Sequence, residues 1–537
     1  MSELTILANR ITDWVDRCPN LDVLTFVDID SKGNFDEETR SYQQLWDNGQ
    51  RLAAWLQAQG MQKGDSFALV MANHPEFVDL MVASSILGTI FVPIDPRTQG
   101  EKLKYMLDYA ECKGAVVADY ARANVETVWA GRNDCWILPM GEQTEAGIEK
   151  ILSSALPTQP LPIESTDPDA PMQMLYTSGT TGDPKAILAP HRRFATAEVI
   201  ATVLGLNADD RPYTGLSLTH ANAQLITLGC SLALGLRCVI SRKFTKSRLW
   251  DISRHYGCTW FNLLGGMTTA LYAQPPRSDD SDNPVRIILS AGMPAAIWED
   301  FGRRFDVELF EFYGAAEGGL TFNPAGVGPV GSCGKAPAIL DLKIFDEQGN
   351  ECAAGEAGEI CFRHADGSTP VVQYFKNPEA SAKKTHAGWL RMGDIGHVDD
   401  AGWLYFHYRM GGGIRRNGDF INTAFVEKVL SEMNSVYDVF VYGIPIQNGA
   451  PGEKDVVAAI VPADVCSFDA EQVFEQCRQS LEKNSVPRYL HIVSNIPKTA
   501  SEKPQERFLL DAFNPDADSV IEDKTLLRRQ GSAMNPA

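Results

Sequence analysis

The sequence predicts a multidomain α/β protein, and three observations support this class. First, the chain has 537 residues, whereas a single domain usually has about 50–250. Second, apolar runs of strand length alternate with helical segments in the first third of the chain. Third, the pattern changes to short β runs from about residue 331 and to mixed structure from about residue 409.

The alternation in the first third predicts a largely parallel sheet. A helix is expected over Leu7 to Val15. Strand-like and helical segments then follow in turn at 67–72, 74–87, 89–95, 101–110 and 114–119. Such alternation is typical of parallel strands covered by helices on both faces. The proline-rich stretch 156–171 is expected to be a surface connection.

The rest of the chain predicts two smaller units. Short β runs separated by glycines and acidic turns, as in 342–363, predict a small barrel or antiparallel sheet over about 331–408. The tail alternates strand-like runs with an amphipathic helix at 468–483. We therefore expect an N-terminal domain over 1–408 and an α+β C-terminal domain over 409–537.

Composition excludes several classes of protein. The formal net charge of −21 argues against a nucleic-acid partner, which would need clustered cations. The eleven cysteines are scattered and form no CxxC pair, as expected of reduced thiols. The N-terminus carries acidic residues among its apolar ones, unlike a signal peptide, and the longest apolar runs are shorter than the roughly 20 residues of a membrane span. We expect a cytoplasmic protein without integral membrane association.

The segment Tyr176 to Lys185, YTSGTTGDPK, is the most informative part of the chain. Its glycines and hydroxyl side chains can surround phosphate oxygens with donors. It is not a Walker A loop, because Lys185 follows Pro184 and not glycine. The structural alternative is a Ser/Thr/Gly-rich hairpin that binds no ligand.

This segment resembles the phosphate-binding signature of the AMP-forming superfamily of acyl-CoA synthetases, adenylation domains and luciferases. Five further segments resemble the other motifs of that superfamily in the same order: LSAGMP (289–294), FYGAAEGG (312–319), WLRMGDIG (389–396), YRMGGGIRRNGDFIN (408–422) and PKTASEK (497–503). Within the superfamily, residues 218–264 are similar to the carnitine and crotonobetaine CoA ligases. Gly411 and residues 311–318 are also similar to fatty-acid-transport and very-long-chain synthetases.

The resemblance implies a fold and a reaction. The implied fold is a large N-terminal domain of two related α/β sheets plus a small β-barrel, followed by a smaller, mobile α+β domain. The implied enzyme is a ligase that converts a carboxylate and ATP to acyl-AMP and pyrophosphate, and then transfers the acyl group to coenzyme A. ATP, Mg²⁺ and coenzyme A are the implied small molecules, and a monomer or homodimer is expected.

The resemblance also implies which residues bind the nucleotide. Tyr313 would stack on the adenine and Asp394 would accept from the ribose, with Arg409 nearby; a core tyrosine and a turn aspartate are the structural alternatives. Thr177 and Glu317 would hold the metal. The full implied ATP/AMP set is Thr177, Ser178, Gly179, Thr180, Thr181, Gly182, Lys185, Gly292, Met293, Pro294, Tyr313, Gly314, Ala316, Asp394 and Arg409.

Catalysis is assigned by the resemblance to Lys503 and Glu317. No general base is needed, because a carboxylic acid is already ionised at neutral pH. Three positions depart from the superfamily pattern: Ala316 stands for threonine, Glu502 for glycine and Tyr408 for aspartate. The first two leave open a pseudo-enzyme that binds nucleotide without turnover.

The second step is assigned to the C-terminal part. The resemblance implies that Gly411 is the hinge and that Gly418 and Asp419 lie along the coenzyme A tunnel. An ordinary flexible loop is the alternative for the glycines at 411–413. A luciferase-like oxygenase and an enzyme that loads a carrier protein are further alternatives. The chain shows no carrier-protein domain before Ala537, which favours a free-standing ligase.

The implied acyl pocket contains His220, Asn222, Trp260 and Phe261. The resemblance also places Ala221, Asn262, Gly292 and Gly314 to Gly318 along its wall. For His220, a capping or core histidine fits equally well. Amides mixed with aromatic rings suit a compact polar acid, and the likeness to carnitine ligases favours the betaine type, whose trimethylammonium group would meet Trp260 or Phe261. A long-chain or aryl acid is the alternative.

Overall fold

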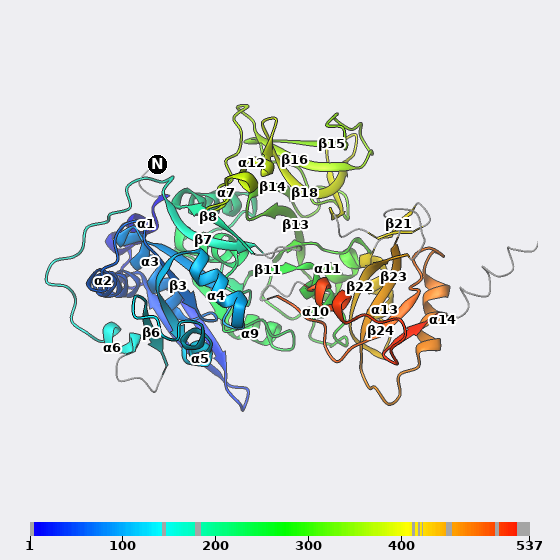
Figure 1. Ribbon diagram of the computed structural model, residues 1–537, viewed down its shortest axis with the longest axis horizontal. Coiled ribbons are helices and arrows are strands. Elements are labelled where there is room, and N and C mark those ends of the chain that lie inside the picture. Colours follow the sequence, from blue (N-terminus) through cyan, green and yellow to red (C-terminus); the bar gives the residue numbers. More distant parts are fainter. Residues whose placement is uncertain are drawn as a thin grey trace, which may run out of the picture.

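The computed structural model confirms the α/β class and resolves several sheets (Figure 1). A large α/β body is followed by an antiparallel sheet and then by a C-terminal domain with its own sheet. No helix in the described part of the chain is both long and apolar enough to cross a membrane. The described residues are 5–141, 147–177, 184–410, 414–416, 419–421, 423–446, 454–499 and 504–523.

One sheet of the large body has six strands in the order β6-β5-β3-β4-β7-β8. All pairs are parallel except the β7–β8 hairpin. The strands are β3 (Ser66–Val70), β4 (Ile90–Ile94), β5 (Cys112–Ala118), β6 (Trp136–Met140), β7 (Pro171–Thr177) and β8 (Lys185–Pro190). The helices among them are α2 (Tyr42–Ala58), α3 (Pro75–Leu87), α4 (Gly100–Tyr109), α5 (Asp119–Val128) and α6 (Ile148–Leu152).

The other sheet of the body has eight strands in the order β14-β13-β12-β11-β9-β10-β1-β2. Its strands are β1 (Asp22–Ile29), β2 (Phe35–Ser41), β9 (Pro212–Thr214), β10 (Cys238–Ser241), β11 (Trp260–Leu264), β12 (Ile287–Ala291), β13 (Glu308–Ala315) and β14 (Gly318–Asn323). Its helical segments are α1 (Leu7–Arg17), η2 (His191–Ala195), α7 (Thr196–Val203), η3 (Asn222–Leu228), α8 (Gly229–Leu234), α9 (Leu249–Tyr256), α10 (Gly265–Tyr272), η4 (Ala295–Ile297) and α11 (Trp298–Phe305).

Helix α3 lies in the core that the two sheets share. Every residue of α3 is buried, and its side chains belong to one apolar cluster with Phe91 of the first sheet and Val239 of the second. Its ends follow local rules: Pro75 occupies the first turn, and Gly88 ends the helix in the left-handed region at φ 72°. Such a mostly apolar helix is stable only when it is buried, and its buried carboxylate Asp79 is paired with Arg40 at 3.0 Å.

The region after the large body forms an antiparallel sheet, which agrees with the short β runs in the sequence. Its strands are β15 (Leu340–Phe345), β16 (Gly358–His364), β17 (Thr385–His386), β18 (Trp389–Val398) and β19 (Leu404–Arg409), with α12 (Pro378–Lys384) beside it. The described main-chain pairs in this sheet are antiparallel. The proposed domain boundary at 408/409 falls at the end of β19.

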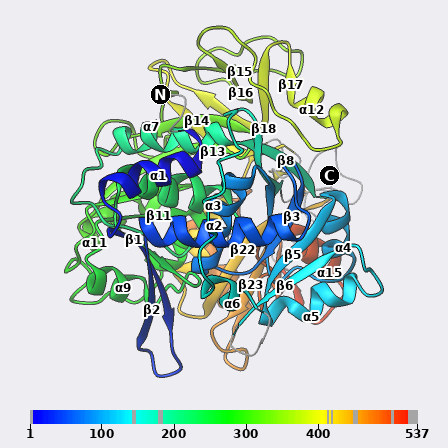
Figure 2. The same cartoon turned by 90° about the vertical axis from the view of Figure 1, so that its left-hand side faces the viewer.

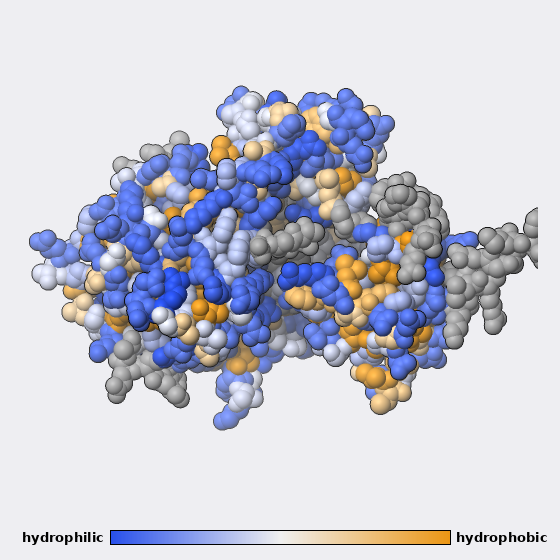
Figure 3. All heavy atoms as spheres, viewed as in Figure 1, coloured by the Kyte–Doolittle hydropathy of each residue, from blue (hydrophilic) through white to orange (hydrophobic). Residues whose placement is uncertain are grey.

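The C-terminal domain has a four-stranded sheet in the order β22-β23-β24-β25 and an apolar core of its own around Val426, Phe474 and Leu490. Its elements are β20 (Arg415–Arg416), β21 (Asp419–Phe420), α13 (Thr423–Ser431), β22 (Val436–Pro445), β23 (Lys454–Pro462), α14 (Ala470–Ser480), β24 (Tyr489–Ile492), α15 (Glu506–Ala512) and β25 (Val520–Glu522). In Figure 3 hydrophobic residues gather on this domain, whereas the large body is mostly hydrophilic in the same view.

Candidate active site

The phosphate-loop prediction falls on the β7–β8 hairpin. Thr177 and Lys185 are main-chain partners at the open end of this antiparallel pair, so the segment between them connects two strands, as the sequence predicts. Ser178, Gly179, Thr180, Thr181 and Gly182 lie outside the described residues, and their roles stay predictions. Thr177 is placed only as a strand residue.

Glu317 and Lys185 are brought together by Tyr374. The Tyr374 hydroxyl donates to Glu317 Oε1 at 2.9 Å, and the Lys185 ammonium lies 5.6 Å from the centre of the Tyr374 ring. Burial and then the Glu317 carboxylate raise the pKa of Tyr374, so its phenol remains a donor at neutral pH. Tyr374 lies in a segment without a motif, so no signal in the sequence pointed to it.

Two further cations lie in the electrostatic environment of Glu317. Burial lowers the pKa of Arg193 in η2, and Glu317 opposes that change. Burial also lowers the pKa of Lys384, with Glu317 as the strongest opposing charge and Asp394 as another. Lys384 donates to the Met392 carbonyl oxygen at 3.0 Å. A carboxylate among donors and cations, next to a phosphate-loop candidate, is suited to an anionic ligand with its counter-ion.

Tyr313 and Asp394, which are predicted to bind the adenine and the ribose, contact each other. The Tyr313 hydroxyl donates to Asp394 Oδ2 at 2.6 Å. Arg409 is the main-chain partner of Asp394 across β18 and β19, and its Nη1 lies 3.8 Å from Asp394 Oδ1. The Tyr313 ring also packs beside Phe362 and Phe406, with both centroid distances at 6.2 Å. Residues from three predicted motifs therefore form one cluster.

The LSAGMP turn is held by Glu311, which sequence analysis did not select. Glu311 on β13 accepts from the amide of Gly292 at 2.5 Å and from that of Met293 at 3.1 Å. Gly292 has φ 99°, a left-handed conformation that favours glycine. Burial raises the pKa of Glu311 to about 8, although the two amides oppose the shift. Gly292, Met293 and Pro294 thus approach β13, which carries Tyr313 and Gly314, and Ala316 packs in the apolar cluster beside Tyr313.

The residues proposed for the acyl pocket separate onto two faces of β11. Trp260 belongs to an apolar cluster with Ile200 of α7 and Ile226 of η3. Phe261 belongs to the core on the other face, where its ring meets Tyr213 edge-on. Successive residues of a strand point to opposite faces, so the two rings cannot line one pocket together.

Asn262, and not Phe261, shares the face of Trp260. Asn262 Nδ2 donates to Asn222 Oδ1, and Thr227 Oγ1 donates to Asn262 Oδ1 at 2.8 Å. His220 precedes η3 on the same side, and its carbonyl oxygen accepts from the Gln224 amide. Asn222 and Trp260 are therefore associated through η3 and β11. The period of two in a strand could have separated Trp260 from Phe261 in the sequence.

The residues predicted to act from the C-terminal part lie largely outside the described residues. This holds for the hinge Gly411, for Gly418 and for the catalytic Lys503, whereas Asp419 begins β21. The segment with Lys503 is bracketed by Lys498 and Pro504, which pair across a bridge. Helix α15 follows this segment. Burial lowers the pKa of Lys102 on α4, and the positive charge of Arg507 on α15 lowers it further. The Lys246 ammonium lies 4.6 Å from the centre of the Tyr437 ring, so the C-terminal domain contacts the large body.

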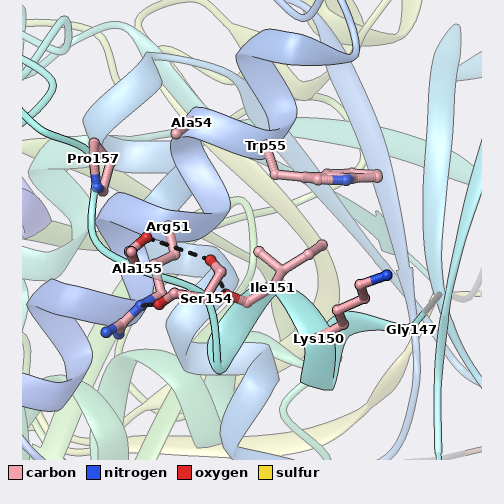
Figure 4. Close-up of a pocket in the computed structure, with 9 residues that line it drawn as sticks. All are labelled: Arg51, Ala54, Trp55, Gly147, Lys150, Ile151, Ser154, Ala155 and Pro157. Atoms are coloured by element: carbon pink, nitrogen blue, oxygen red, sulfur yellow. Dashed lines mark hydrogen bonds between the residues drawn. The ribbon is translucent and has the colours of Figure 1, made fainter. Parts of the chain in front are cut away.

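A cavity elsewhere on the large body is not part of this cluster. It has a volume of about 520 Å³ and lies between α2 and α6, where Arg51, Trp55 and Ile151 surround it (Figure 4). The Arg51 guanidinium donates to the Ser154 carbonyl oxygen at its edge. None of the described residues predicted for nucleotide, acid or coenzyme A lines it.

Comparison with known proteins agrees with the motifs and the fold. The family model described as "AMP-binding enzyme" matches residues 11–369, and that of the "AMP-binding enzyme C-terminal domain" matches residues 426–503. The chain is 30% identical over 454 residues to the medium/long-chain-fatty-acid–CoA ligase FadD17 of Mycobacterium marinum, covering 82% of this chain and 85% of that protein. It is 27% identical over 476 residues to a crotonobetaine/carnitine–CoA ligase of Escherichia coli O157:H7, covering 86% and 91%.

Solved structures show the same fold. The anthranilate CoA ligase AuaEII in complex with anthranoyl-AMP has a TM-score of 0.81 at 22% identity, covering 94% of this chain and 96% of that one. A benzoate CoA ligase from Burkholderia xenovorans LB400 has a TM-score of 0.79 at 20% identity, covering 94% and 99%. The chain therefore belongs to the AMP-binding enzyme family and is an AMP-forming acid–thiol ligase.

Proposed function

We propose that this chain activates a carboxylic acid with ATP and transfers the acyl group to coenzyme A. In the first step a carboxylate oxygen attacks the α-phosphorus of ATP, so that acyl-AMP forms and pyrophosphate leaves. In the second step the coenzyme A thiolate attacks the acyl carbon and AMP leaves. The observation that carries the proposal is that the cluster of Tyr313, Asp394 and Arg409 lies near Glu317 and Lys185. The two groups are linked by Tyr374, on whose pKa Arg409 acts, and by Lys384, on whose pKa Glu317, Arg409 and Asp394 all act.

The nucleotide is assigned to this cluster. The adenine stacks on Tyr313, and base–aromatic stacking contributes about 1–3 kcal/mol. Asp394 accepts from the ribose hydroxyls in place of the Tyr313 phenol or beside it. Lys185 and the hydroxyls of the β7–β8 segment bind phosphate oxygens. Glu317 and Thr177 would hold Mg²⁺, which favours carboxylate oxygen and neutralises phosphate charge.

Lys503 is assigned to the first step only. Its ammonium would stabilise the charge that develops as the carboxylate attacks the α-phosphate. The charge of Arg507 on α15 is near enough to Lys102 on α4 to lower the pKa of Lys102, after burial, and this supports a position of α15 near the large body.

The second step is assigned to a rotation of the C-terminal domain about Gly411, since glycine tolerates large changes of φ and ψ. After it, Gly418 and Asp419 would line the path of coenzyme A. The C-terminal domain exposes three large apolar side chains, those of Tyr437, Phe508 and Leu510. Such side chains could pack on the large body in more than one orientation of the domain, which supports the rotation.

The acid is proposed to be short or medium in length and of the betaine type. The amides of Asn222 and Asn262 lie on the side of β11 that carries Trp260. The buried Trp260 indole N–H has no hydrogen-bond partner among the described residues, so an acceptor atom of the acid, and not its ammonium group, would satisfy it. A trimethylammonium group against this ring would gain about 0.5–2 kcal/mol by cation–π attraction. The relatives include both fatty-acid and crotonobetaine/carnitine ligases.

The test is ATP–pyrophosphate exchange with carnitine, γ-butyrobetaine, a neutral acid of equal length, a long-chain fatty acid and an aryl acid. Exchange with any of these, followed by thioester formation when coenzyme A is added, is the expected result. Pyrophosphate exchange without thioester formation would indicate that the acyl acceptor is a carrier protein and not coenzyme A. Tight nucleotide binding without exchange would make the chain a pseudo-enzyme, and a preference for the fatty or aryl acid would refute the betaine assignment alone.

A further inference from the structure

A second, polar cavity lies at the edge of the eight-stranded sheet where β1, β9 and β10 begin. Its volume is about 380 Å³. The predicted site residues of this sheet lie at or just after the C-terminal ends of the parallel strands β12 and β13. The cavity is therefore at the opposite edge, and Figure 2 shows β2 and α9 far from β13 and β18. Its lining consists of Asn20, Asp22, Thr25, Glu37, Thr39, Arg211, Arg237, His255 and Tyr256.

Two arginines of the cavity make no ion pair with the described carboxylates. Arg211 directly precedes β9 and Arg237 directly precedes β10, and these strands pair in parallel, so the two residues lie side by side at the sheet edge. The Nε of Arg211 is buried and has no hydrogen-bond partner in the described part of the chain. A buried guanidinium N–H without a partner is costly, so an acceptor is expected to occupy the cavity.

Tyr256 provides a second donor, which interacts with the Glu37 carboxylate but has no described partner at hydrogen-bonding distance. The residue is 7% exposed, and its hydroxyl is buried without a hydrogen bond to any described group. Burial and then the nearby Glu37 carboxylate raise the pKa of Tyr256, so the phenol is protonated at neutral pH. Thr25 and Thr39, which are main-chain partners across β1 and β2, add two hydroxyls.

We propose that this cavity binds a compact oxyanion, the phosphate or carboxylate group of a small molecule. The buried atoms without partners, Arg211 Nε and the Tyr256 hydroxyl, are both donors. The carboxylates of Asp22 and Glu37 would repel an anion, but both residues are exposed to solvent. His255 is also exposed. A pair of guanidinium groups with a phenol matches the several acceptor positions of an oxyanion. The site does not depend on the function proposed for the other edge of the sheet.

The test is calorimetric titration of the full chain, saturated with AMP, with inorganic phosphate, sulfate or acetate. Saturation with AMP reduces binding of the probe at the nucleotide site. We expect one class of site, and the comparison of phosphate with acetate tells which kind of oxyanion it takes. Arg211→Gln and Arg237→Gln should each weaken binding by about tenfold or more, because each removes a charge-assisted hydrogen bond.

Three further variants make the assignment specific. Tyr256→Phe should weaken binding several-fold with little change in Tm, because within the described residues the hydroxyl has only the weak interaction with the Glu37 carboxylate to lose. Glu37→Gln should tighten binding, because it removes a negative charge near the ligand. Arg277→Gln, at an exposed arginine paired with Asp279, is the matched control and should change nothing. Absence of binding by all three anions, unchanged binding in both cavity arginine variants, or weaker binding in Glu37→Gln would each overturn the proposal.

Discussion

The hydroxyl of Tyr313 donates to the carboxylate of Asp394 at 2.6 Å and so joins β13 of the eight-stranded sheet to β18 of the antiparallel sheet. The two residues are far apart in the sequence, yet both were assigned to the nucleotide. Their contact makes the adenine and ribose positions one unit. A change at Tyr313 should therefore affect the nucleotide through the ring and through the hydroxyl separately.

Tyr313→Phe keeps the ring and removes the hydrogen bond, so the KM for ATP should rise by about three- to tenfold. Tyr313→Ala also removes the stacking surface, and its KM for ATP should rise by about 10- to 100-fold. Steady-state exchange kinetics at saturating acid measure both. An unchanged KM in Tyr313→Ala would leave Tyr313 as a core residue only.

Lys503→Ala should reduce acyl-adenylate formation by about a hundredfold or more, which corresponds to roughly 3 kcal/mol of lost transition-state stabilisation. Thioester formation from preformed acyl-AMP should stay nearly intact, because the lysine is assigned only to the first step. Rapid-quench measurements of each half-reaction make the comparison. Lys498→Ala, at the lysine that pairs with Asp438, is the control; wild-type exchange in Lys503→Ala would remove that residue from the mechanism.

Gly411→Pro should have the reverse effect. Proline fixes φ near roughly −65° and should hinder the rotation of the C-terminal domain. Exchange of pyrophosphate should survive, and the thioester step should fail. Equal loss of both half-reactions would indicate general damage to the domain.

Trp260 and Phe261 should behave differently, because they lie on opposite faces of β11. Trp260→Leu should change the ratio of kcat/KM values between a betaine and its neutral analogue by about two- to thirtyfold, the range expected for one cation–π contact. Phe261→Leu should lower Tm and leave that ratio unchanged, since its ring packs on Tyr213 in the core. If Phe261→Leu alone shifted the ratio, the assignment of the faces would be wrong.

The buried Glu311 should make stability depend on pH. Its pKa is about 8 in the folded protein and near that of an ordinary glutamate, about 4.3, when unfolded. Between these values the folded state holds a proton that the unfolded state releases, so stability falls as pH rises from about 5 to 8. The cost is fully present above pH 8, and a shift of this size corresponds to roughly 5 kcal/mol, since one pKa unit is worth about 1.4 kcal/mol.

Melting temperatures of wild type and Glu311→Gln from pH 5 to 9 test this dependence. A neutral amide does not titrate, so the Tm of the variant should rise relative to that of wild type as pH increases. The altered hydrogen bonds to Gly292 and Met293 should add a difference in Tm that does not depend on pH. Glu299→Gln, at an exposed glutamate, should run parallel to wild type. A constant difference between Glu311→Gln and wild type over the whole range would contradict the raised pKa.

Local signals in the sequence were sufficient for the fold class and the family. The strand and helix periods from Phe67 to Asp119 match β3, α3, β4, α4 and β5 closely, because burial on both faces of a parallel sheet imposes those periods. The order of the six motifs identified the family, since each motif is a short contiguous segment. The phosphate-loop residues and Lys503 remain predictions from that order.

Only the tertiary structure selected Tyr374 and Lys384, which lie in no motif and reach the site by packing. It also assigned Glu311, the first residue of the segment 311–318, to holding the LSAGMP turn. The structure also showed which apolar cluster receives each ring, because successive residues of β11 point to opposite faces and Trp260 packs with Ile226 of η3 whereas Phe261 packs with Tyr213. The oxyanion cavity is of the same kind: Arg211, Arg237 and Tyr256 meet because β9, β10 and α9 converge at one sheet edge. Sequence patterns record which groups are near in the chain, whereas sheet order and side-chain packing decide which distant groups come within hydrogen-bonding distance.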